Sequence, residues 1–237
     1  MKKGLKVTYL KHSGFLVEME DKYLLFDYWK GEIPALDYKK TLYVFVSHVH
    51  HDHYAKDIFK LENRCEVVKY ILSFDIQRTN SWKQAEQVYF LDARESVEID
   101  DLQIKTLCST DEGVAFLIKT SGYTIYHAGD LHWWHWPGDP EEDNQRRKDT
   151  YQKEIDLLTG ENIDCAFVVL DPRQEEAGSW GMDYFLKQVG ARYIFPMHCW
   201  EKYSIIKEYI DKNERKYLTG TIMNITAPGQ TFNIDRD

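Results

Sequence analysis

One short run of residues carries most of the metal-binding chemistry that this sequence offers. Residues 47–53 read Ser-His-Val-His-His-Asp-His and hold four of the nine histidines of the chain. The run follows the apolar, strand-like segment 42–46 directly. Imidazoles and a carboxylate crowded at a strand end compete and desolvate one another unless a divalent cation holds them together. The run therefore predicts a metal site at the end of a strand.

The spacing within the run divides its donors between two ions. His48 and His50 are two residues apart, so in an extended segment both side chains point to the same side and can bind one ion. Asp52 and His53 follow where the chain turns and can reach a second ion close to the first. The alternative is a histidine-rich surface loop without metal.

The pattern His48-x-His50-x-Asp52-His53 resembles the metal signature of the metallo-β-lactamase superfamily. This resemblance implies an α/β fold, a four-layer αβ/βα sandwich in which two mixed β-sheets are flanked by helices. It also implies a metal-dependent hydrolase. The segment around His12 and the Gly129-Asp130 pair are similar to the ascorbate-6-phosphate-lactonase-like and phospholipase-D-like branches.

The resemblance extends to two later strand ends. Asp130 follows Gly129 and matches the aspartate that bridges two ions in the superfamily, and His198 matches the last histidine ligand. The metal ligands that the resemblance implies are His48, His50, Asp52, His53, Asp130 and His198. Asp52 and Asp130 are also the catalytic candidates, with Asp52 orienting the nucleophile or relaying its proton.

One histidine of the superfamily pattern is missing. Where a third histidine is expected, residues 108–113 read Cys-Ser-Thr-Asp-Glu-Gly. Asp111 is the best substitute because a carboxylate oxygen can replace an imidazole nitrogen, although Cys108 or a water would also serve. Alternatively, Asp111 simply forms the turn of this loop.

Further residues are candidates for the surroundings of the metals. The resemblance implies that His12 lines the active site and that Asp27 supports the metal loop. The alternatives are that His12 is an ordinary surface histidine and that Asp27 only begins a turn. The loop after Asp130 contains three tryptophans and two histidines. His132, Trp134 and His135 form either a pocket wall or a plug packed on the protein's own helices.

Arg173 ends another strand-like segment, where it holds a substrate anion at the pocket rim or forms a salt bridge. The salt bridge is the more ordinary expectation for a chain with so many acidic residues.

Composition narrows the class of protein. The chain has 237 residues, 43% of them hydrophobic and 29% charged, which predicts a single globular domain over residues 1–237. Its four cysteines lie far apart in sequence, and no apolar run approaches a membrane span or a signal-peptide core, so a cytoplasmic protein is expected. A net charge of −9 without a basic run argues against nucleic-acid binding.

Hydrophobic patterning predicts a β-rich first half followed by strands that alternate with helices. Strands are expected over residues 6–10, 15–19, 23–27, 42–46, 66–73, 87–91, 96–100, 102–107, 113–120, 123–128, 165–170, 193–195 and 224–234. Helical segments are expected over residues 55–61, 143–159, 182–189 and 201–215. No internal repeat is legible in the sequence.

The expected function is hydrolysis of a small ester, lactone or phosphodiester by a hydroxide held between two divalent ions. Zinc is the first choice for these ions, with Mn2+ or Fe2+ as alternatives. The expected partner is a small-molecule substrate, and homo-oligomer formation is left open. The competing hypothesis is a non-catalytic metal-binding sensor or scaffold that kept the fold and lost one ligand.

Overall fold

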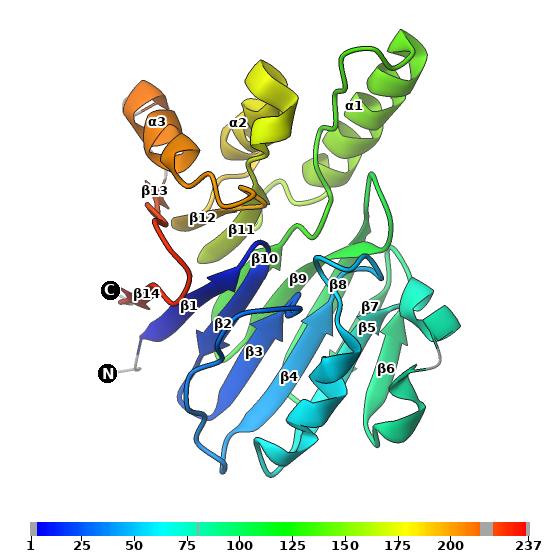
Figure 1. The fold of residues 1–237 in the computed structure, drawn as a ribbon, viewed down its shortest axis with the longest axis vertical. Helices are drawn as coiled ribbons and strands as arrows, with labels where there is room; N and C mark the ends of the chain where they lie inside the picture. The colour runs from blue at the N-terminus through cyan, green and yellow to red at the C-terminus, as the bar shows by residue number, and fades with distance from the viewer. Residues whose placement is uncertain (1–3, 80, 214–219, 236–237) are drawn as a thin grey trace. The chain divides into compact units, whose positions relative to one another are not determined.

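The computed structural model describes residues 4–79, 81–213 and 220–235. The chain divides into two compact units: a first unit of residues 1–92 and 227–237, and a second unit of residues 93–226. Each unit is built around one seven-stranded sheet (Figure 1). The expectation of a single domain stays a prediction.

The sheet of the first unit has the strand order β14-β1-β2-β3-β4-β5-β6. Its strands are β1 (Leu5–Lys11), β2 (Gly14–Glu18), β3 (Lys22–Phe26), β4 (Thr41–Val46), β5 (Val68–Ser73), β6 (Val88–Leu91) and β14 (Thr231–Ile234). β14, β1, β2 and β3 pair antiparallel, and β3 to β6 pair parallel. The sheet is therefore mixed.

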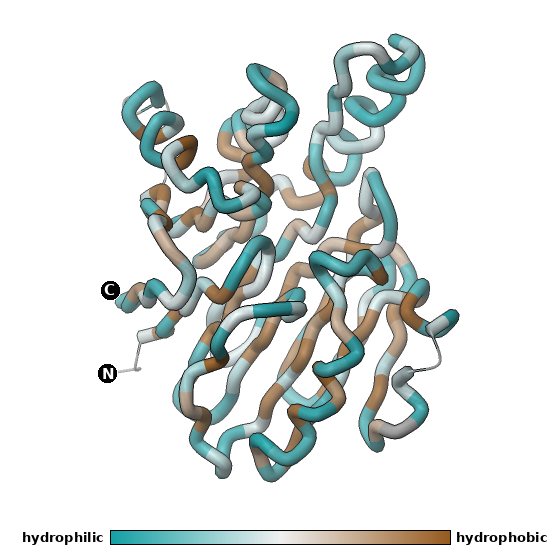
Figure 2. The backbone as a smooth tube through the Cα atoms, in the orientation of Figure 1, coloured by the Kyte–Doolittle hydropathy of each residue, from teal (hydrophilic) through white to brown (hydrophobic). Residues whose placement is uncertain are grey.

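Strands that are buried on both faces form the core of the first unit. In β4, Leu42, Val44 and Val46 join one buried cluster, which also contains Ile58 and Phe59 of the 3-10 helix η1 (Lys56–Asn63). The residues between them in β4 are buried too, and strands that are covered on both faces read as continuous apolar runs. Figure 2 shows these strands in the hydrophobic colours.

The sheet of the second unit has the order β13-β12-β11-β10-β9-β8-β7. Its strands are β7 (Ser96–Ile99), β8 (Leu102–Cys108), β9 (Val114–Thr120), β10 (Tyr123–His127), β11 (Cys165–Val169), β12 (Tyr193–Met197) and β13 (Thr221–Ile222). β7 to β10 pair antiparallel, and β10 to β13 pair parallel. The two-residue turn Ser121-Gly122 joins β9 to β10, and both residues have positive φ, as a tight hairpin turn requires.

Helices α1 (Glu141–Asp156), α2 (Trp180–Gln188) and α3 (Ser204–Asn213) lie on the same side of the second sheet in Figure 1. α1 contacts α2, and α2 contacts β11 and the 3-10 helix η4 (Pro172–Ser179). Two shorter 3-10 helices, η2 (Phe74–Thr79) and η3 (Ser81–Gln84), belong to the first unit. Among the described residues, no helix combines the length and the apolar character that a membrane crossing needs.

The expected mixed sheets with flanking helices are confirmed, and most expected elements lie within a few residues of their observed bounds. The strand expected over 224–234 is wrong in part, because only 231–234 is extended and β13 ends at Ile222. The helix expected over 201–215 begins at Ser204, and its residues 214 and 215 lie outside the described part of the chain. Residues 1–3, where no element was expected, also lie outside it.

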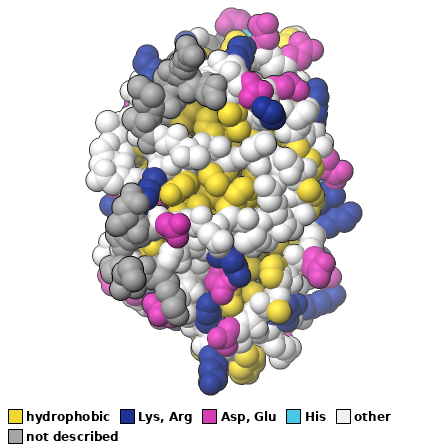
Figure 3. Space-filling view, turned by 90° about the vertical axis from the view of Figure 1, so that its left-hand side faces the viewer, with side chains coloured by type: hydrophobic (Ala, Val, Ile, Leu, Met, Phe, Trp, Pro, Cys, Tyr) yellow, Lys and Arg dark blue, Asp and Glu magenta, His cyan; other side chains and the backbone are white. Residues whose placement is uncertain are grey.

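Positive and negative side chains are interspersed on the face drawn in Figure 3, which shows no continuous basic area. The mixture of signs on this face agrees with the acidic composition of the chain.

Candidate metal centre

In the first unit, the histidine run begins where β4 ends, and Asp27 supports it from the end of β3. Asp27 is completely buried and has a φ of 41°. One of its carboxylate oxygens accepts the Ser47 N–H at 2.7 Å, and the other accepts the Ser47 hydroxyl at 2.6 Å. Because β3 and β4 are parallel neighbours, their carboxyl ends meet at one edge of the sheet, which brings Asp27 to the histidine run.

Oxygen atoms hold the Nδ1 side of two imidazoles in this run. His53 Nδ1 lies 2.7 Å from Asp27 Oδ2, and His48 Nδ1 lies 3.0 Å from Ser47 Oγ. Since the Ser47 hydroxyl already donates to Asp27, both histidines donate from Nδ1 and keep the lone pair on Nε2. This is how metal-binding histidines are oriented by their supporting oxygens.

The imidazoles of the run are packed closely together. The ring centroids of His48 and His53 are 4.1 Å apart, and those of His48 and His50 are 4.7 Å apart. His48 and His53 are completely buried. By contrast, the side chain of His51 is 88% exposed and lies at the surface, where its Nδ1 is 3.9 Å from Asp52 Oδ1.

Asp52 and His12 lie together in the same unit. His12 Nε2 is 3.4 Å from Asp52 Oδ2, and the His12 ring meets the His53 ring edge-on at 5.5 Å. Burial opposes the ionisation of Asp52, but the hydrogen bond from His12 and the charge of His53 hold the pKa of Asp52 below its usual range. Asp52 is therefore a carboxylate, which is the form that binds a cation.

A further carboxylate, Asp75, supports the backbone of the run. It lies just after β5, and its Oδ2 accepts the Val49 N–H at 2.9 Å. Asp75 was not among the predicted residues, although its signal resembles that of Asp27: it is an acidic residue two positions past an apolar strand, whereas Asp27 follows its strand directly.

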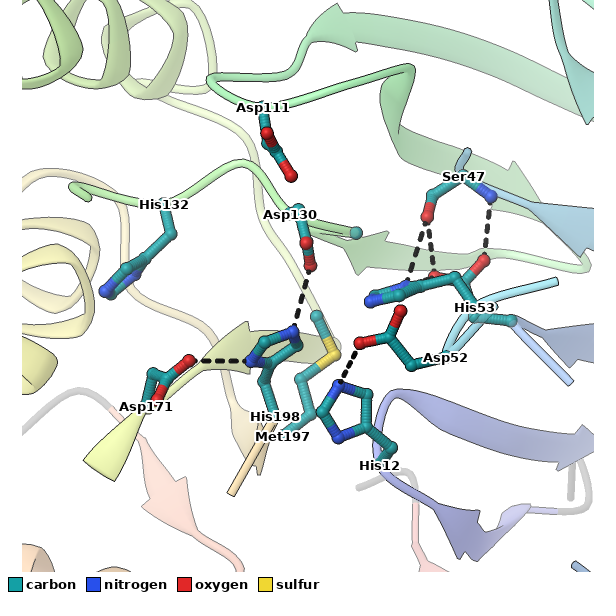
Figure 4. A network of polar contacts seen from close by, with 12 residues as sticks. His12, Ser47, Asp52, His53, Asp111, Asp130, His132, Asp171, Met197 and His198 are labelled. Carbon is teal, nitrogen blue, oxygen red and sulfur yellow. Dashed lines mark hydrogen bonds and ion pairs between the residues drawn. The ribbon is translucent and has the colours of Figure 1, made fainter. Parts of the chain in front are cut away.

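In the second unit, Asp130 and His198 are brought together by β10 and β12, which flank β11. His198 Nε2 lies 3.4 Å from Asp130 Oδ1 (Figure 4). On the other side of the ring, His198 Nδ1 lies 3.0 Å from Asp171 Oδ2, so His198 repeats the supported geometry of His53.

Asp171 follows β11 and has two partners. Its carboxylate accepts from His198 and from the Arg173 guanidinium, whose Nε lies 3.0 and 2.9 Å from its two oxygens. Burial opposes the ionisation of Asp171, but these two partners hold its pKa below the usual range. The expected salt bridge of Arg173 is thus present, and the sequence analysis had missed Asp171 as its partner.

Asp111, the substitute that the sequence predicts for the missing histidine, lies between β8 and β9. It is exposed, and one of its carboxylate oxygens lies within 4.8 Å of an Asp130 oxygen. Figure 4 shows the Asp111 carboxylate directed toward Asp130. Thr110, the residue before Asp111, fixes this loop to the loop that follows Asp130. Its Oγ1 donates to the His132 carbonyl at 2.6 Å and accepts the His132 N–H at 3.0 Å.

The loop after Asp130 divides into a buried and a half-buried part. Trp134 is 5% exposed and donates from Nε1 to the Asp130 carbonyl at 3.0 Å. His132 is completely buried against Trp134 and Tyr151. His135 is half-buried and packs on Trp180 of α2. His132 and Trp134 thus plug the loop onto its own unit, and a pocket role for these three residues stays a prediction.

Positive φ values mark several of these positions. His12 has a φ of 57°, and His198 has a φ of 65°. Such conformations are costly for residues with a side chain, and they persist where the surroundings impose them, as at functional sites. Positive φ thus occurs at one candidate ligand, His198, and at two residues that contact candidate ligands, His12 and Asp27.

The donor set suits a first-row transition metal. Imidazole nitrogens with carboxylate oxygens are ligands for zinc, iron and manganese, and three of the histidines have a supporting oxygen on Nδ1. The residues present in each unit therefore fit the group that the sequence predicts.

Comparisons with known proteins agree with this chemistry. A family model described as a beta-lactamase superfamily domain matches residues 6–149. A UPF0173 metal-dependent hydrolase of Methanosarcina barkeri is 32% identical over 145 residues, which cover 54% of this chain and 61% of the relative. The chain thus spans less than two thirds of the length of this curated relative.

Two solved structures have a similar fold. Igni18, a metallo hydrolase from Ignicoccus hospitalis, aligns with a TM-score of 0.69 at 18% identity and covers 98% of this chain and 99% of its own. CmlA, a diiron beta-hydroxylase from Streptomyces venezuelae, aligns with a TM-score of 0.64 at 12% identity over 98% of this chain and 55% of its own. At these identities, the likeness concerns the fold alone.

Proposed function

Because the chain belongs to the beta-lactamase superfamily, whose domain model matches residues 6–149, we propose that it is a metal-dependent hydrolase of a small ester, lactone or phosphodiester. The observation that carries the proposal is the support of His48, His53 and His198, each of which has an oxygen atom on its Nδ1 side. The name of the Methanosarcina relative, a metal-dependent hydrolase, supports the same reading.

The proposed ligand set is the one implied by the sequence. By the resemblance, His48 and His50, with Asp111, would hold one divalent ion, Asp52, His53 and His198 would hold a second, and Asp130 would contribute to both. Zinc is the proposed metal. Iron is the main alternative, since a diiron enzyme shares the fold. When bound, such ions supply a Lewis acid and lower the pKa of a water toward neutrality.

The protein's own groups then hold and move protons. Asp52 is ionised and lies next to His12, so Asp52 Oδ2 can accept a proton and His12 Nε2 can share it. Two further carboxylates orient candidate ligands: Asp171 fixes the ring plane of His198, and Asp27 fixes the ring plane of His53. These two carboxylates act by orientation and do not touch the substrate.

The first experiment is elemental analysis of protein purified without added metal or chelator. About two ions per chain are expected, and the same measurement distinguishes zinc, iron and manganese. Hydrolysis of p-nitrophenyl esters, lactones and bis-p-nitrophenyl phosphate is then assayed.

His50→Ala and Asp52→Ala should lose metal and activity together. His51→Ala is the matched control, because it removes a histidine from the same run whose side chain is exposed. If His51→Ala were as damaging as His50→Ala, the proposed ligand set would be wrong.

One observation favours a second candidate, a metal-binding sensor without turnover. An exposed aspartate stands where the superfamily pattern has a histidine, which weakens one ion site. Bound metal without hydrolysis of any substrate class in the panel would support the sensor and reject the hydrolase.

A further inference from the structure

Beside His198, aromatic rings and one guanidinium form a continuous stack in the second unit, which we name the Trp–Arg stack (Trp134, Trp136, Arg173 and Trp200). The rings of Trp134 and Trp136 are 5.9 Å apart and nearly parallel, at 6°. The Arg173 guanidinium carbon lies 5.5 Å from the Trp136 ring centre and 4.4 Å from the Trp200 ring centre. The guanidinium thus lies within cation–π distance of two indoles.

The stack contacts the candidate metal ligand directly. Trp134 and Trp200 both meet the His198 ring edge-on, at centroid distances of 5.7 and 5.6 Å. A molecule held on this stack would therefore lie beside His198.

The guanidinium is only partly used by the protein. Asp171 takes the Nε and Nη2 side of Arg173. A guanidinium has five N–H donors, and among the described residues none accepts a hydrogen bond from Nη1. The end formed by Nη1 and the second Nη2 hydrogen therefore remains available, and the Arg173 side chain is 44% exposed.

Exposure of the indole next to it is also high for so large an apolar side chain. Trp200 is 42% exposed, and its backbone has a φ of 48°. The neighbouring Glu201 also has a positive φ, of 62°. The strained backbone keeps Trp200 at the surface beside Arg173, although burial of an indole would be favourable.

We propose that the Trp–Arg stack is the substrate-anchoring site of this protein, and that its ligand is an organic acid carrying an aromatic or bulky apolar group. The carboxylate binds the free end of the Arg173 guanidinium in a two-point contact, and the apolar group packs on Trp200. This inference rests on the proposed function, since it gives the hydrolase a substrate class: esters or lactones that bear a second, anionic group.

Two physical features favour an anion at this place. Asp171 and the two indoles hold the guanidinium in one orientation, so little side-chain entropy is lost when a ligand binds. The charge of Arg173 is offset by Asp171 on one side only. A planar carboxylate matches two of the three remaining N–H groups, one on Nη1 and one on Nη2.

Calorimetric titration of the protein as purified, with small probes, tests this inference. Phenylacetate should bind about tenfold more tightly than its neutral isostere phenylacetamide, as expected for a charge-assisted hydrogen-bonded pair. Arg173→Gln should reduce this ratio to near one, and Arg173→Lys should give an intermediate ratio because lysine lacks the planar end.

A matched control uses a second arginine of the same unit. Arg192 also stacks on an aromatic ring, with its guanidinium carbon 5.2 Å from the Tyr193 ring, but it precedes β12, whereas His198 follows it. Arg192→Gln should leave the ratio unchanged. Trp200→Ala should weaken phenylacetate several-fold and leave acetate unchanged.

A carboxylate can also bind a metal ion, so the titrations are repeated after chelation. A preference for phenylacetate that persists without metal and is lost in Arg173→Gln supports the stack as the anchor. A preference that vanishes on chelation, or that Arg173→Gln leaves intact, overturns it. Tighter binding of phenylphosphonate than of phenylacetate would overturn the carboxylate assignment.

The readout is independent of turnover. Arg173-dependent binding in a protein that hydrolyses nothing would contradict the proposed hydrolase and leave the anchoring site standing. Hydrolysis of a substrate class in the panel, together with equal affinity for the charged and neutral probes, would support the proposed hydrolase and overturn the anchoring site.

Discussion

Asp27 is the residue on which the orientation of the histidine run depends most. Both of its carboxylate oxygens bond to Ser47, and one also bonds to His53. Asp27→Asn keeps the shape of the side chain but replaces one acceptor oxygen with a donor. We expect metal affinity to fall about 10- to 100-fold, the usual cost of losing such a supporting group.

Competition with a chromophoric chelator measures this loss of affinity. Asp21→Asn is the control, because the Asp21 side chain is 64% exposed and lies in the turn between β2 and β3. Equal metal affinity of Asp27→Asn and the unmodified protein would remove Asp27 from the support of the site.

His132 should make the stability of the protein depend on pH. Burial lowers the pKa of its imidazole from 6.5 to about 4. Between these values the unfolded chain binds a proton that the folded protein does not, so the free energy of unfolding should fall as the pH drops from 6.5 to 4. The full effect is on the order of 3 kcal/mol.

His132→Phe keeps a ring in the same space and removes this titration. Urea unfolding of both proteins at several pH values in this window should show a shallower pH dependence for the variant, whatever its absolute stability. Parallel pH profiles would show that His132 is not the titrating group.

The sequence could predict the candidate ligands and the supporting residue Asp27, but not the support from Asp75 and Asp171. Histidines crowded into residues 47–53 have little other chemical reason to be together. Asp75 and Asp171, by contrast, are single acidic residues past apolar strands, a pattern that turn aspartates share. Only the pairing of neighbouring strands shows that their carboxylates reach Val49 and His198.

Among the elements, α1 holds the loop that carries Asp111. Glu154 of this helix is completely buried, and its Oε2 accepts the Cys108 N–H at 2.9 Å where β8 ends. Its other oxygen pairs with Arg94. The helix therefore fixes the start of residues 109–113 through one carboxylate.

Glu154→Leu should loosen this loop. The Cys108 N–H would lose its acceptor, which costs about 1–3 kcal/mol of unfolding free energy. Amide hydrogen exchange over residues 108–113 should accelerate. Glu142→Leu on the exposed side of α1 is the control, and unchanged exchange in Glu154→Leu would contradict this role.

Elements with a clear apolar pattern were predictable, whereas β13 and the 3-10 helices η2 and η4 were not. β4 and β11 are almost continuous apolar segments; Ser47 follows β4, and Leu170 and then Asp171 follow β11. β13 has only two residues, too few for any periodicity to show. The 3-10 helices η2 and η4 have no apolar repeat and depend on tertiary contacts.

Across the whole molecule, the two units repeat one plan that the sequence did not reveal. In each, antiparallel strands lead into parallel ones, and polar residues follow the carboxyl ends of three successive parallel strands. They are Asp27, Ser47 and Asp75 in the first unit, and Asp130, Asp171 and His198 in the second. The repetition lies in topology and not in residue identity, so no sequence repeat announces it.

Removal of residues 228–237 should destabilise the first unit. β14 pairs with β1 from Leu5↔Ile234 to Thr8↔Thr231, and its loss leaves an open strand edge on β1. Such edges promote self-association. We expect a lower melting temperature and larger species on size-exclusion chromatography than for the full chain.

Asn233→Ala is the control for this deletion, because the Asn233 side chain is exposed and the backbone pairing remains. If the shortened protein melted and eluted like the full chain, β14 would contribute nothing to the first unit.

The late position of β14 also has a consequence for biosynthesis. β1 is translated before residues 93–226, whereas its partner strand β14 is translated only after them. At about 5–20 residues per second, this interval is on the order of ten seconds. During that time the nascent chain carries an unpaired β1 edge, so the first unit completes its sheet only after translation of the second has finished.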